Sequence, residues 1–187
     1  ATPARELPVD TNAAPPPRVP YTGARIKPRL EIAGRPSPLP AAYAALRAGD
    51  LALAERLYTE TLAGEPDQSD AHLGLGALAQ GRGDDAAAVR HYRAVLETVP
   101  DHPRAWAGLA ALAGNGELGP MESKLRGLIA ARPAPALHFA LGNVLARQGR
   151  WAEAQQGFFA ASAADPQNAD YAFNLAVSLE RIGKPSA

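Results

Sequence analysis

The sequence predicts an all-α fold of stacked antiparallel helix-turn-helix repeats, preceded by a proline-rich extended tail. Three observations support this prediction. Apolar residues recur with helical spacing after position 41, glycines and prolines punctuate these segments with one common period, and prolines crowd residues 1–40. Glycines and prolines that recur independently with the same period are hard to obtain by chance. We therefore expect an array of repeats, each burying one apolar stripe against its neighbours.

The segment from Ala136 to Pro166 shows the repeating unit most clearly. It contains two segments of helical apolar periodicity, joined by a tight turn at Gly149. Small residues at Gly142 and Ala154 predict a close approach of two helix axes, with the bulk of Phe158 beside them. The proline that closes the segment cannot continue a helix, so it ends the unit.

The same punctuation recurs along the chain. The turn glycines are Gly49, Gly83, Gly116, Gly149 and Gly183, and the terminating prolines are Pro66, Pro100, Pro133 and Pro166. Successive members of each set stand about 34 residues apart, which is the period of the tetratricopeptide repeat (TPR), a unit of helix, turn and helix. Residues 41–183 resemble that family.

The resemblance is strongest in the units that contain His72 and His138, where the small, aromatic and proline positions are all filled. A third unit contains Trp106, but Pro120 and Met121 predict an irregular second helix. The resemblance implies a right-handed superhelix over residues 41–187, with about four repeats and a terminal helix, after a tail at residues 1–40.

Helix starts can be placed from residues that cap helices or open their first turn. A first, cap-like unit is expected as a short helix ending near Gly49 and a partner helix over residues 51–63. Further helices are expected to run to Gln80 and to about Thr98. The predicted starting residues are Pro40, Ser69 or Asp70, Asp84 or Asp85, Pro103, Pro135 and Asn168.

The tail holds 10 of the 18 prolines, which favours polyproline II or coil. Within it, residues 25–32 alternate between charged and apolar positions, with proline at position 28. This pattern is typical of an edge strand that could add to a partner's sheet, and it is also compatible with a basic, solvated linker. The residues of the possible strand addition are Arg25, Ile26, Lys27, Arg29, Leu30 and Ile32, within a segment at 24–32.

The sequence offers few parts for catalysis. It contains no cysteine, no paired metal-ligand motif and no nucleophile motif, and its glycine-rich stretch at 74–83 follows no strand. Two of the four histidines take the large-residue position of the TPR pattern, which predicts packing. We therefore expect no enzyme activity, no cofactor and no metal. Lys and Arg balance Asp and Glu at 19 each, which gives no global reason to expect nucleic acid.

The resemblance implies a concave groove formed by the second, fifth, sixth, ninth and thirteenth positions of each repeat. The predicted partner-binding residues are Leu73, Ala77, Arg104, Phe139, Asn143, Arg147, Phe173, Asn174, Val177 and Arg181. Chaperone-binding TPR domains carry lysine at the fifth position, where this chain has Leu73, Phe139 or Phe173, so that carboxylate clamp is absent. The side chains of Asn143 and Asn174 could form hydrogen bonds with the backbone of an extended peptide. For Asn174 the alternative is that its side chain only solvates its own helix.

These features predict a non-catalytic scaffold that binds a protein or an extended peptide. Residues 137–155 and 168–181 are also similar to the repeat region of bacterial type IV or MSHA-type pilus biogenesis proteins. This similarity implies a role in assembling a cell-envelope machine, in the periplasm or envelope, with cytoplasmic placement as the alternative. The rival function is a substrate-capturing or regulatory arm of a larger enzyme. Met121 is the only methionine, so we expect further sequence upstream, including the possibility of a membrane anchor.

The last predicted helix, over 169–182, forms only half of a repeat. Its apolar residues are spread round more than one stripe, so one preceding hairpin cannot bury them all. We expect an exposed apolar patch that is covered by a following helix, a protein partner or a second copy, which would give a homo-oligomer.

Overall fold

The computed structural model describes residues 36–183, of which about 80% are helical, and it contains no strand among these described residues. The predicted tail segment at 24–32, with its possible strand addition, lies outside the described residues. The helices in the described part are α1 (Leu39–Arg47), α2 (Leu51–Gly64), α3 (Ser69–Gly81), α4 (Asp85–Thr98), α5 (Pro103–Leu112), the 3₁₀ turn η1 (Asn115–Glu117), α6 (Leu118–Ala131), α7 (Pro135–Arg147), α8 (Trp151–Ala164) and α9 (Ala169–Gly183).

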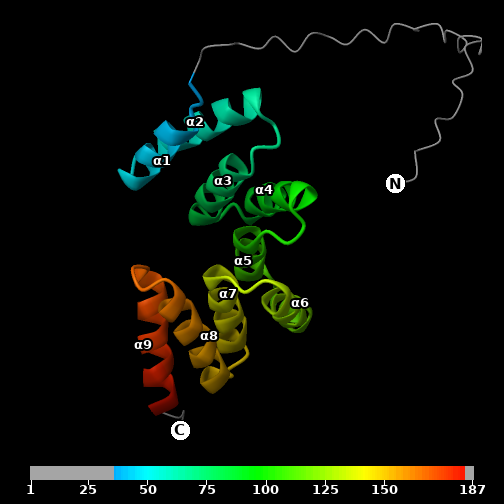
Figure 1. Cartoon of the computed structure of the whole chain (residues 1–187), viewed down its shortest axis with the longest axis vertical. Helices are drawn as coiled ribbons and strands as arrows, with labels where there is room; N and C mark the ends of the chain where they lie inside the picture. Colours follow the sequence, from blue (N-terminus) through cyan, green and yellow to red (C-terminus); the bar gives the residue numbers. More distant parts are fainter. Residues whose placement is uncertain (1–35, 184–187) are drawn as a thin grey trace, which may run out of the picture. The chain divides into compact units, whose positions relative to one another are not determined.

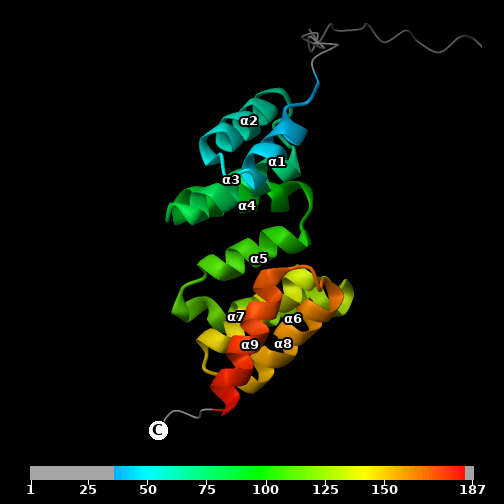
Figure 2. The same cartoon turned by 90° about the vertical axis from the view of Figure 1, so that its left-hand side faces the viewer.

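Successive helices pack as antiparallel hairpins, α1 with α2, α3 with α4 and α7 with α8, and each hairpin stacks on the next (Figures 1 and 2). The first helices of neighbouring units also meet, since α5 contacts both α3 and α7. The last helix, α9, packs on α8. Because the connections are short, neighbouring helices must run antiparallel, and the predicted all-α stack of helix-turn-helix repeats is confirmed.

Three of the five predicted turn glycines adopt the left-handed conformation that a tight helical turn requires. Their φ angles are 79° at Gly49, 78° at Gly83 and 77° at Gly149. The other two predictions of a turn glycine are wrong in detail, because Gly116 lies inside η1 and Gly183 is the last residue of α9. The 3₁₀ turn leads straight into α6, so no left-handed residue is needed there.

The terminating prolines are placed as predicted. Each lies two residues beyond the end of a helix, at Pro66, Pro100, Pro133 and Pro166. Pro120, which predicted irregularity, is the third residue of α6. The first-turn amides of a helix have no intrahelical acceptor, so a proline there costs little.

Side-chain caps fix several helix starts. The carboxylate of Asp50 accepts from the backbone N–H of Leu53 at 3.0 Å, and that of Asp84 accepts from Ala87 at 2.9 Å. The prediction that Ser69 or Asp70 caps α3 is wrong. Its N-cap is Gln68, whose side-chain oxygen accepts from the backbone N–H of Asp70 at 3.4 Å, because the helix starts one residue earlier.

Close glycine-to-ring contacts hold the hairpins together. A Cβ atom on Gly142 would lie 2.7 Å from the ring of Phe158, and one on Gly76 would lie 2.7 Å from the ring of Tyr92. Both distances are shorter than van der Waals contact, so only hydrogen fits at these positions. The predicted close crossing at Gly142 is therefore present.

Candidate peptide-binding groove

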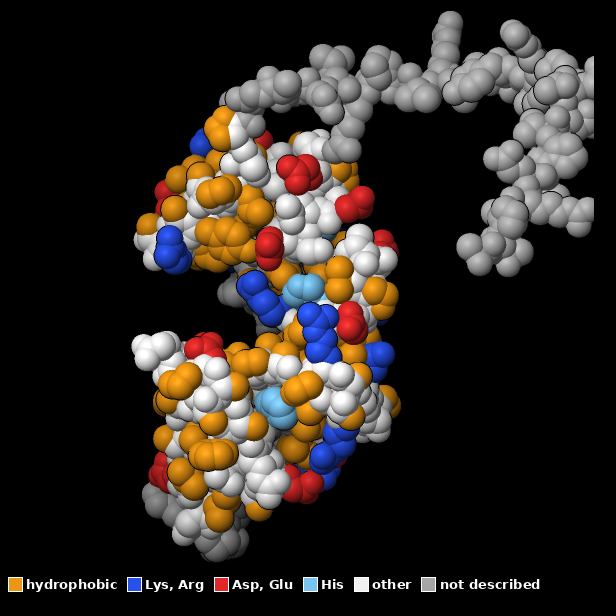
Figure 3. All heavy atoms as spheres, viewed as in Figure 1, with side chains coloured by type: hydrophobic (Ala, Val, Ile, Leu, Met, Phe, Trp, Pro, Cys, Tyr) orange, Lys and Arg blue, Asp and Glu red, His pale blue; other side chains and the backbone are white. Residues whose placement is uncertain are grey.

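A groove of about 420 Å³ lies on the concave side of the stack and is lined by α3, α4, α5, α7 and the start of α9. Figure 3 shows a hollow between the N-terminal and C-terminal helices, with basic and histidine side chains at its floor. Five of the predicted partner-binding residues line the groove, namely Leu73, Ala77, Arg104, Phe139 and Asn143. Residues from three helix hairpins thus meet in one site.

An aromatic wall forms the C-terminal side of the groove. The rings of Phe139 and Tyr171 lie 4.8 Å apart between centroids, and Phe139 also contacts the buried Phe158 at 5.7 Å. Burial raises the pKa of the Tyr171 hydroxyl, and Asp165 adds to the effect. Phe139 packs on the buried ring of Phe158 and is itself only half-buried. Its exposed ring surface can therefore receive an apolar side chain.

The floor of the groove is tightly packed. The buried Tyr92 donates a hydrogen bond from its hydroxyl to the side-chain oxygen of Gln80 at 2.9 Å. A Cβ atom on Gly108 would lie 2.4 Å from the same Tyr92 ring, so α5 approaches α4 as closely as backbone allows. Leu73 is only 3% exposed and contributes to this floor more than to a reachable contact surface.

Arg104 supplies the positive charge of the groove. Its side chain is 59% exposed, and its nearest carboxylate is Asp70 at 3.9 Å, which is a loose ion pair. Burial raises the pKa of the nearby Tyr43, and Asp70 adds to that rise while Arg104 opposes it. Because the pair is long and exposed, the guanidinium can turn toward a carboxylate on a bound ligand with little loss.

The two predicted asparagines differ in their availability. Asn143 lines the groove, and its amide makes no hydrogen bond with another of the described residues. Asn174 instead donates from its side-chain nitrogen to the backbone carbonyl of Asp170 at 2.8 Å. The structure therefore favours the helix-solvating interpretation for Asn174 and leaves the Asn143 amide free to bond a ligand.

The remaining predicted residues lie away from this groove. Arg147 donates from one guanidinium nitrogen to the backbone carbonyl of Ala113 at 2.7 Å and to Asn115 at 3.3 Å, so it anchors the irregular turn before α6. Arg181 lies over the ring of Trp151 at 5.5 Å. Phe173 and Val177 are on α9 and do not line the groove.

Sequence reasoning missed part of the lining. The additional lining residues are Gln80, Tyr92, Ala107, Gly108, Ala111, Ala136, Ala140, Asn168, Asp170 and Tyr171. Several occupy concave positions of α5 and α7 that are alanine or glycine, and small side chains gave no signal of a binding role. Tyr171 was missed because its position in α9 faces the preceding hairpin, which only the packing of that helix shows.

Comparison with protein-family models finds the tetratricopeptide repeat at residues 45–112, 122–169 and 139–187. These matches cover most of the helical part of the chain. The chain belongs to the tetratricopeptide repeat family. No curated protein matches the sequence.

Solved structures show the same TPR fold at low sequence identity. A thermophilic TPR protein of Thermus thermophilus matches with a TM-score of 0.66 and 21% identity, over 78% of this chain and 81% of that one. PilF of Pseudomonas aeruginosa matches with a TM-score of 0.61 and 17% identity, over 78% of this chain and 68% of PilF. MamA of Desulfovibrio magneticus, from residue 41 to the end, matches with a TM-score of 0.54 and 20% identity, over 78% of this chain and 84% of that one. At these identities the likeness shows the fold alone.

The large-residue position of the TPR pattern ties two of the units to the loops before them. The Nε1–H of Trp106 donates to the carbonyl of Pro100 at 2.9 Å, and Nε2 of His72 lies 2.9 Å from the carbonyl of Pro66. A carbonyl only accepts, so His72 carries its proton on Nε2, and its Nδ1 accepts from Nδ1 of His91 at 3.0 Å. Burial lowers the pKa of His91, and His72 lowers it further.

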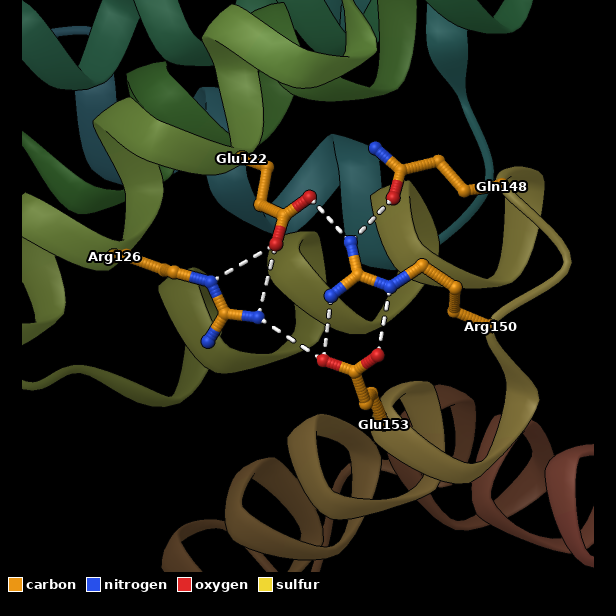
Figure 4. A network of polar contacts seen from close by, with 5 residues as sticks. All are labelled: Glu122, Arg126, Gln148, Arg150 and Glu153. Carbon is orange, nitrogen blue, oxygen red and sulfur yellow. Dashed lines mark hydrogen bonds and ion pairs between the residues drawn. The ribbon is translucent and has the colours of Figure 1, made fainter.

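A polar network connects α6 with the α7–α8 turn and with α8 (Figure 4). Arg150, in the α7–α8 turn, donates to Glu122 of α6 and to Gln148, at 2.7 and 2.8 Å, and it also donates to Glu153 at 2.7 Å. Burial raises the pKa of Glu122, but hydrogen bonds from Arg126, Arg150 and Gln148 outweigh this and leave that pKa below its usual value. The network ties α6 to the α7–α8 hairpin.

The described residues contain no group of three or more His, Asp or Glu side chains placed to hold a metal ion. In the same part of the chain, no helix combines the length and apolarity needed to cross a membrane. TPR domains commonly mediate interactions between proteins.

Proposed function

We propose that this protein is a non-catalytic scaffold that binds a protein partner as an extended segment in the concave groove. The supporting observation is the combination, within one groove, of a half-buried aromatic surface at Phe139, an available amide at Asn143 and an exposed guanidinium at Arg104. An apolar side chain of the ligand would rest on Phe139 and Tyr171, its backbone would bond Asn143, and a carboxylate would pair with Arg104.

We further propose that the partner belongs to a bacterial cell-envelope machine, such as a pilus or secretion system. The support is the similarity of residues 137–155 and 168–181 to the repeat region of type IV or MSHA-type pilus biogenesis proteins. In those proteins a proline-rich tether precedes the repeats, and here 10 of the 18 prolines lie in residues 1–40.

The groove can be tested with the chain of residues 1–187 as bait. Proteins from a bacterial envelope extract would be captured, identified by mass spectrometry, and titrated individually against the bait. We expect the double variant Phe139→Ala, Asn143→Ala to weaken binding of a true partner at least tenfold, because central aromatic contacts dominate such interfaces. Phe159→Ala is the matched control, since this phenylalanine is 58% exposed on α8 and does not line the groove.

Circular dichroism separates a binding defect from a folding defect. If the double variant loses helicity together with binding, then Phe139 and Asn143 are core residues and the proposed site is wrong. If the control weakens binding as much as the double variant, the partner binds the outer surface of the stack. Capture of cytoplasmic proteins alone, with the groove dependence intact, would overturn the envelope role but leave the groove.

A further inference from the structure

Tyr58 carries a buried hydroxyl group that has no hydrogen-bond partner among the described residues. Its side chain is fully buried between α2 and α3, and a Cβ atom on Gly74 would lie 2.5 Å from its ring. A buried polar group without a partner destabilises a fold, so such groups are rare in native proteins. The exceptions are expected mainly at functional sites.

Tyr92 shows what this tyrosine position does in the next repeat. It follows Tyr58 by 34 residues and rests on α5 in the same way, because a Cβ atom on Gly108 would lie 2.4 Å from its ring. Tyr92 lines the groove, and its hydroxyl donates to the side-chain oxygen of Gln80 at 2.9 Å. The residue 34 positions before Gln80 is Leu46, which packs against the apolar cluster around Tyr58. The leucine side chain offers no acceptor, and this difference between the repeats leaves the Tyr58 hydroxyl unpaired.

The polar neighbours of the Tyr58 hydroxyl belong to the N-terminal end of the groove. Burial raises the pKa of this hydroxyl most, followed by Tyr43, while Arg104 opposes the rise and Asp70 adds to it. The rings of Tyr43 and Tyr58 meet edge to face, at 5.8 Å between centroids. Arg104 lines the groove, and its side chain and that of Asp70 are each about half exposed. The hydroxyl therefore lies close beneath the concave surface.

A second buried atom without a partner lies beside the same ion pair. It is Nδ1 of His102, the N-cap residue of α5. Burial lowers the pKa of His102, Arg104 lowers it further, and Asp70 opposes this. Within residues 36–183, the two buried side-chain atoms that lack a partner thus both have Asp70 and Arg104 as charged neighbours. Unsatisfied atoms gathered at one place are typical of a site that a ligand completes.

We propose that a peptide bound in the groove extends past Arg104 to the first hairpin, α1 and α2, where one of its backbone carbonyl oxygens accepts a hydrogen bond from the Tyr58 hydroxyl. This inference rests on the proposed function, because it concerns the same extended ligand. A tyrosine hydroxyl can donate to a carbonyl, and every residue of an extended peptide offers one. The half-buried Tyr43 ring, which contacts Tyr58, has to turn aside, and such side-chain rotations are common when interfaces form.

The ligand must be long enough to reach both Phe139 and Tyr58. Between α7 and α1 it crosses three steps from the first helix of one repeat to that of the next. Helices in contact pack about 8–10 Å apart, so the path is roughly 24–30 Å long. An extended chain advances about 3.4 Å per residue, and roughly seven to nine residues are therefore required.

A phage-displayed library of dodecapeptides supplies the probe, because its members exceed that length. Peptides would be selected on the chain of residues 1–187, synthesised, and titrated by calorimetry. We expect Tyr58→Phe, which removes only the hydroxyl, to weaken binding roughly three- to tenfold. Thr59→Val is the matched control, since it removes an exposed hydroxyl that donates to the carbonyl of Glu55 on its own helix. Equal weakening in the two variants would overturn the inference.

The stability of the free chain gives an independent measurement. Tyr58→Phe should leave the melting temperature unchanged or raise it, because no hydrogen bond is lost. Tyr92→Phe should lower it by about 2–4 °C, because the bond to Gln80 is lost. Equal losses in the two variants would show that the Tyr58 hydroxyl has a partner in the free chain, and the inference would then be wrong.

The double variant Phe139→Ala, Asn143→Ala separates this inference from the proposed function. Peptides that depend on Phe139 but bind Tyr58→Phe as tightly as the parent chain overturn the inference alone. Peptides that bind both variants as tightly as the parent chain, or a library that yields no binder, overturn the proposed groove as well. Peptides that need both the groove residues and the Tyr58 hydroxyl support the two together.

Discussion

Replacing Gly142 by leucine tests the close helix crossing that defines the repeat. A Cβ atom at this position would lie 2.7 Å from the ring of Phe158 and 3.2 Å from the backbone oxygen of Ala154. Phe158 is 1% exposed and cannot swing into solvent. Overpacking of this kind costs about 1–3 kcal/mol, occasionally more, and leucine returns only about 0.8 kcal/mol as a better helix former than glycine.

The magnitude can be isolated with a matched substitution. Gly127 lies in the interior of α6, is exposed, and a Cβ atom there would meet nothing within 4 Å. Gly127→Leu should therefore keep the propensity gain without the clash. We expect Gly142→Leu to lower the free energy of unfolding by up to roughly 2 kcal/mol, which is the overpacking cost less the propensity gain, and Gly127→Leu to raise it by up to about 0.8 kcal/mol.

Urea unfolding followed by circular dichroism measures both changes. A difference between the two variants of about 2 kcal/mol would correspond to roughly 4–8 °C in melting temperature for a domain of this size. Equal shifts in the two variants would refute the reasoning, because they would mean that the crossing at Gly142 has room for added carbon atoms.

Two further predictions concern ionisable groups. The pKa of His91 is lowered from 6.5 by burial and by neighbouring charge, so below about pH 6.5 the unfolded chain binds more protons and stability falls as the pH falls. His91→Gln should flatten this slope of unfolding free energy over roughly pH 5 to 7, and an unchanged slope would exclude His91 as its source. Arg150→Met should lower the melting temperature by disconnecting Glu122 from Glu153, and the loss should shrink in high salt. A salt-independent loss would indicate that packing by the arginine stem is responsible.

The sequence alone determined the repeat architecture and much of the groove. Periodic punctuation is local, because a proline cannot continue a helix beyond its first turn and a glycine readily adopts the left-handed conformation of a tight turn. The positions of Phe139, Asn143 and Arg104 in the groove followed from this register once the family pattern was applied. Local rules are sufficient here because each repeat contacts mainly its neighbours.

Other features depended on contacts between units that no local pattern encodes. The role of Arg147 is set by the irregular turn that it reaches, and Asn174 uses its amide on its own helix. Gly116 stands at the position that the glycine period predicts, but it lies in the 3₁₀ turn η1, which runs directly into α6. The exposure of Leu179, compared with the burial of Leu145 at the same repeat position, is decided by whether a second helix packs there. Sequence period fixes where a side chain points along the stack, but burial depends on what tertiary packing places against it.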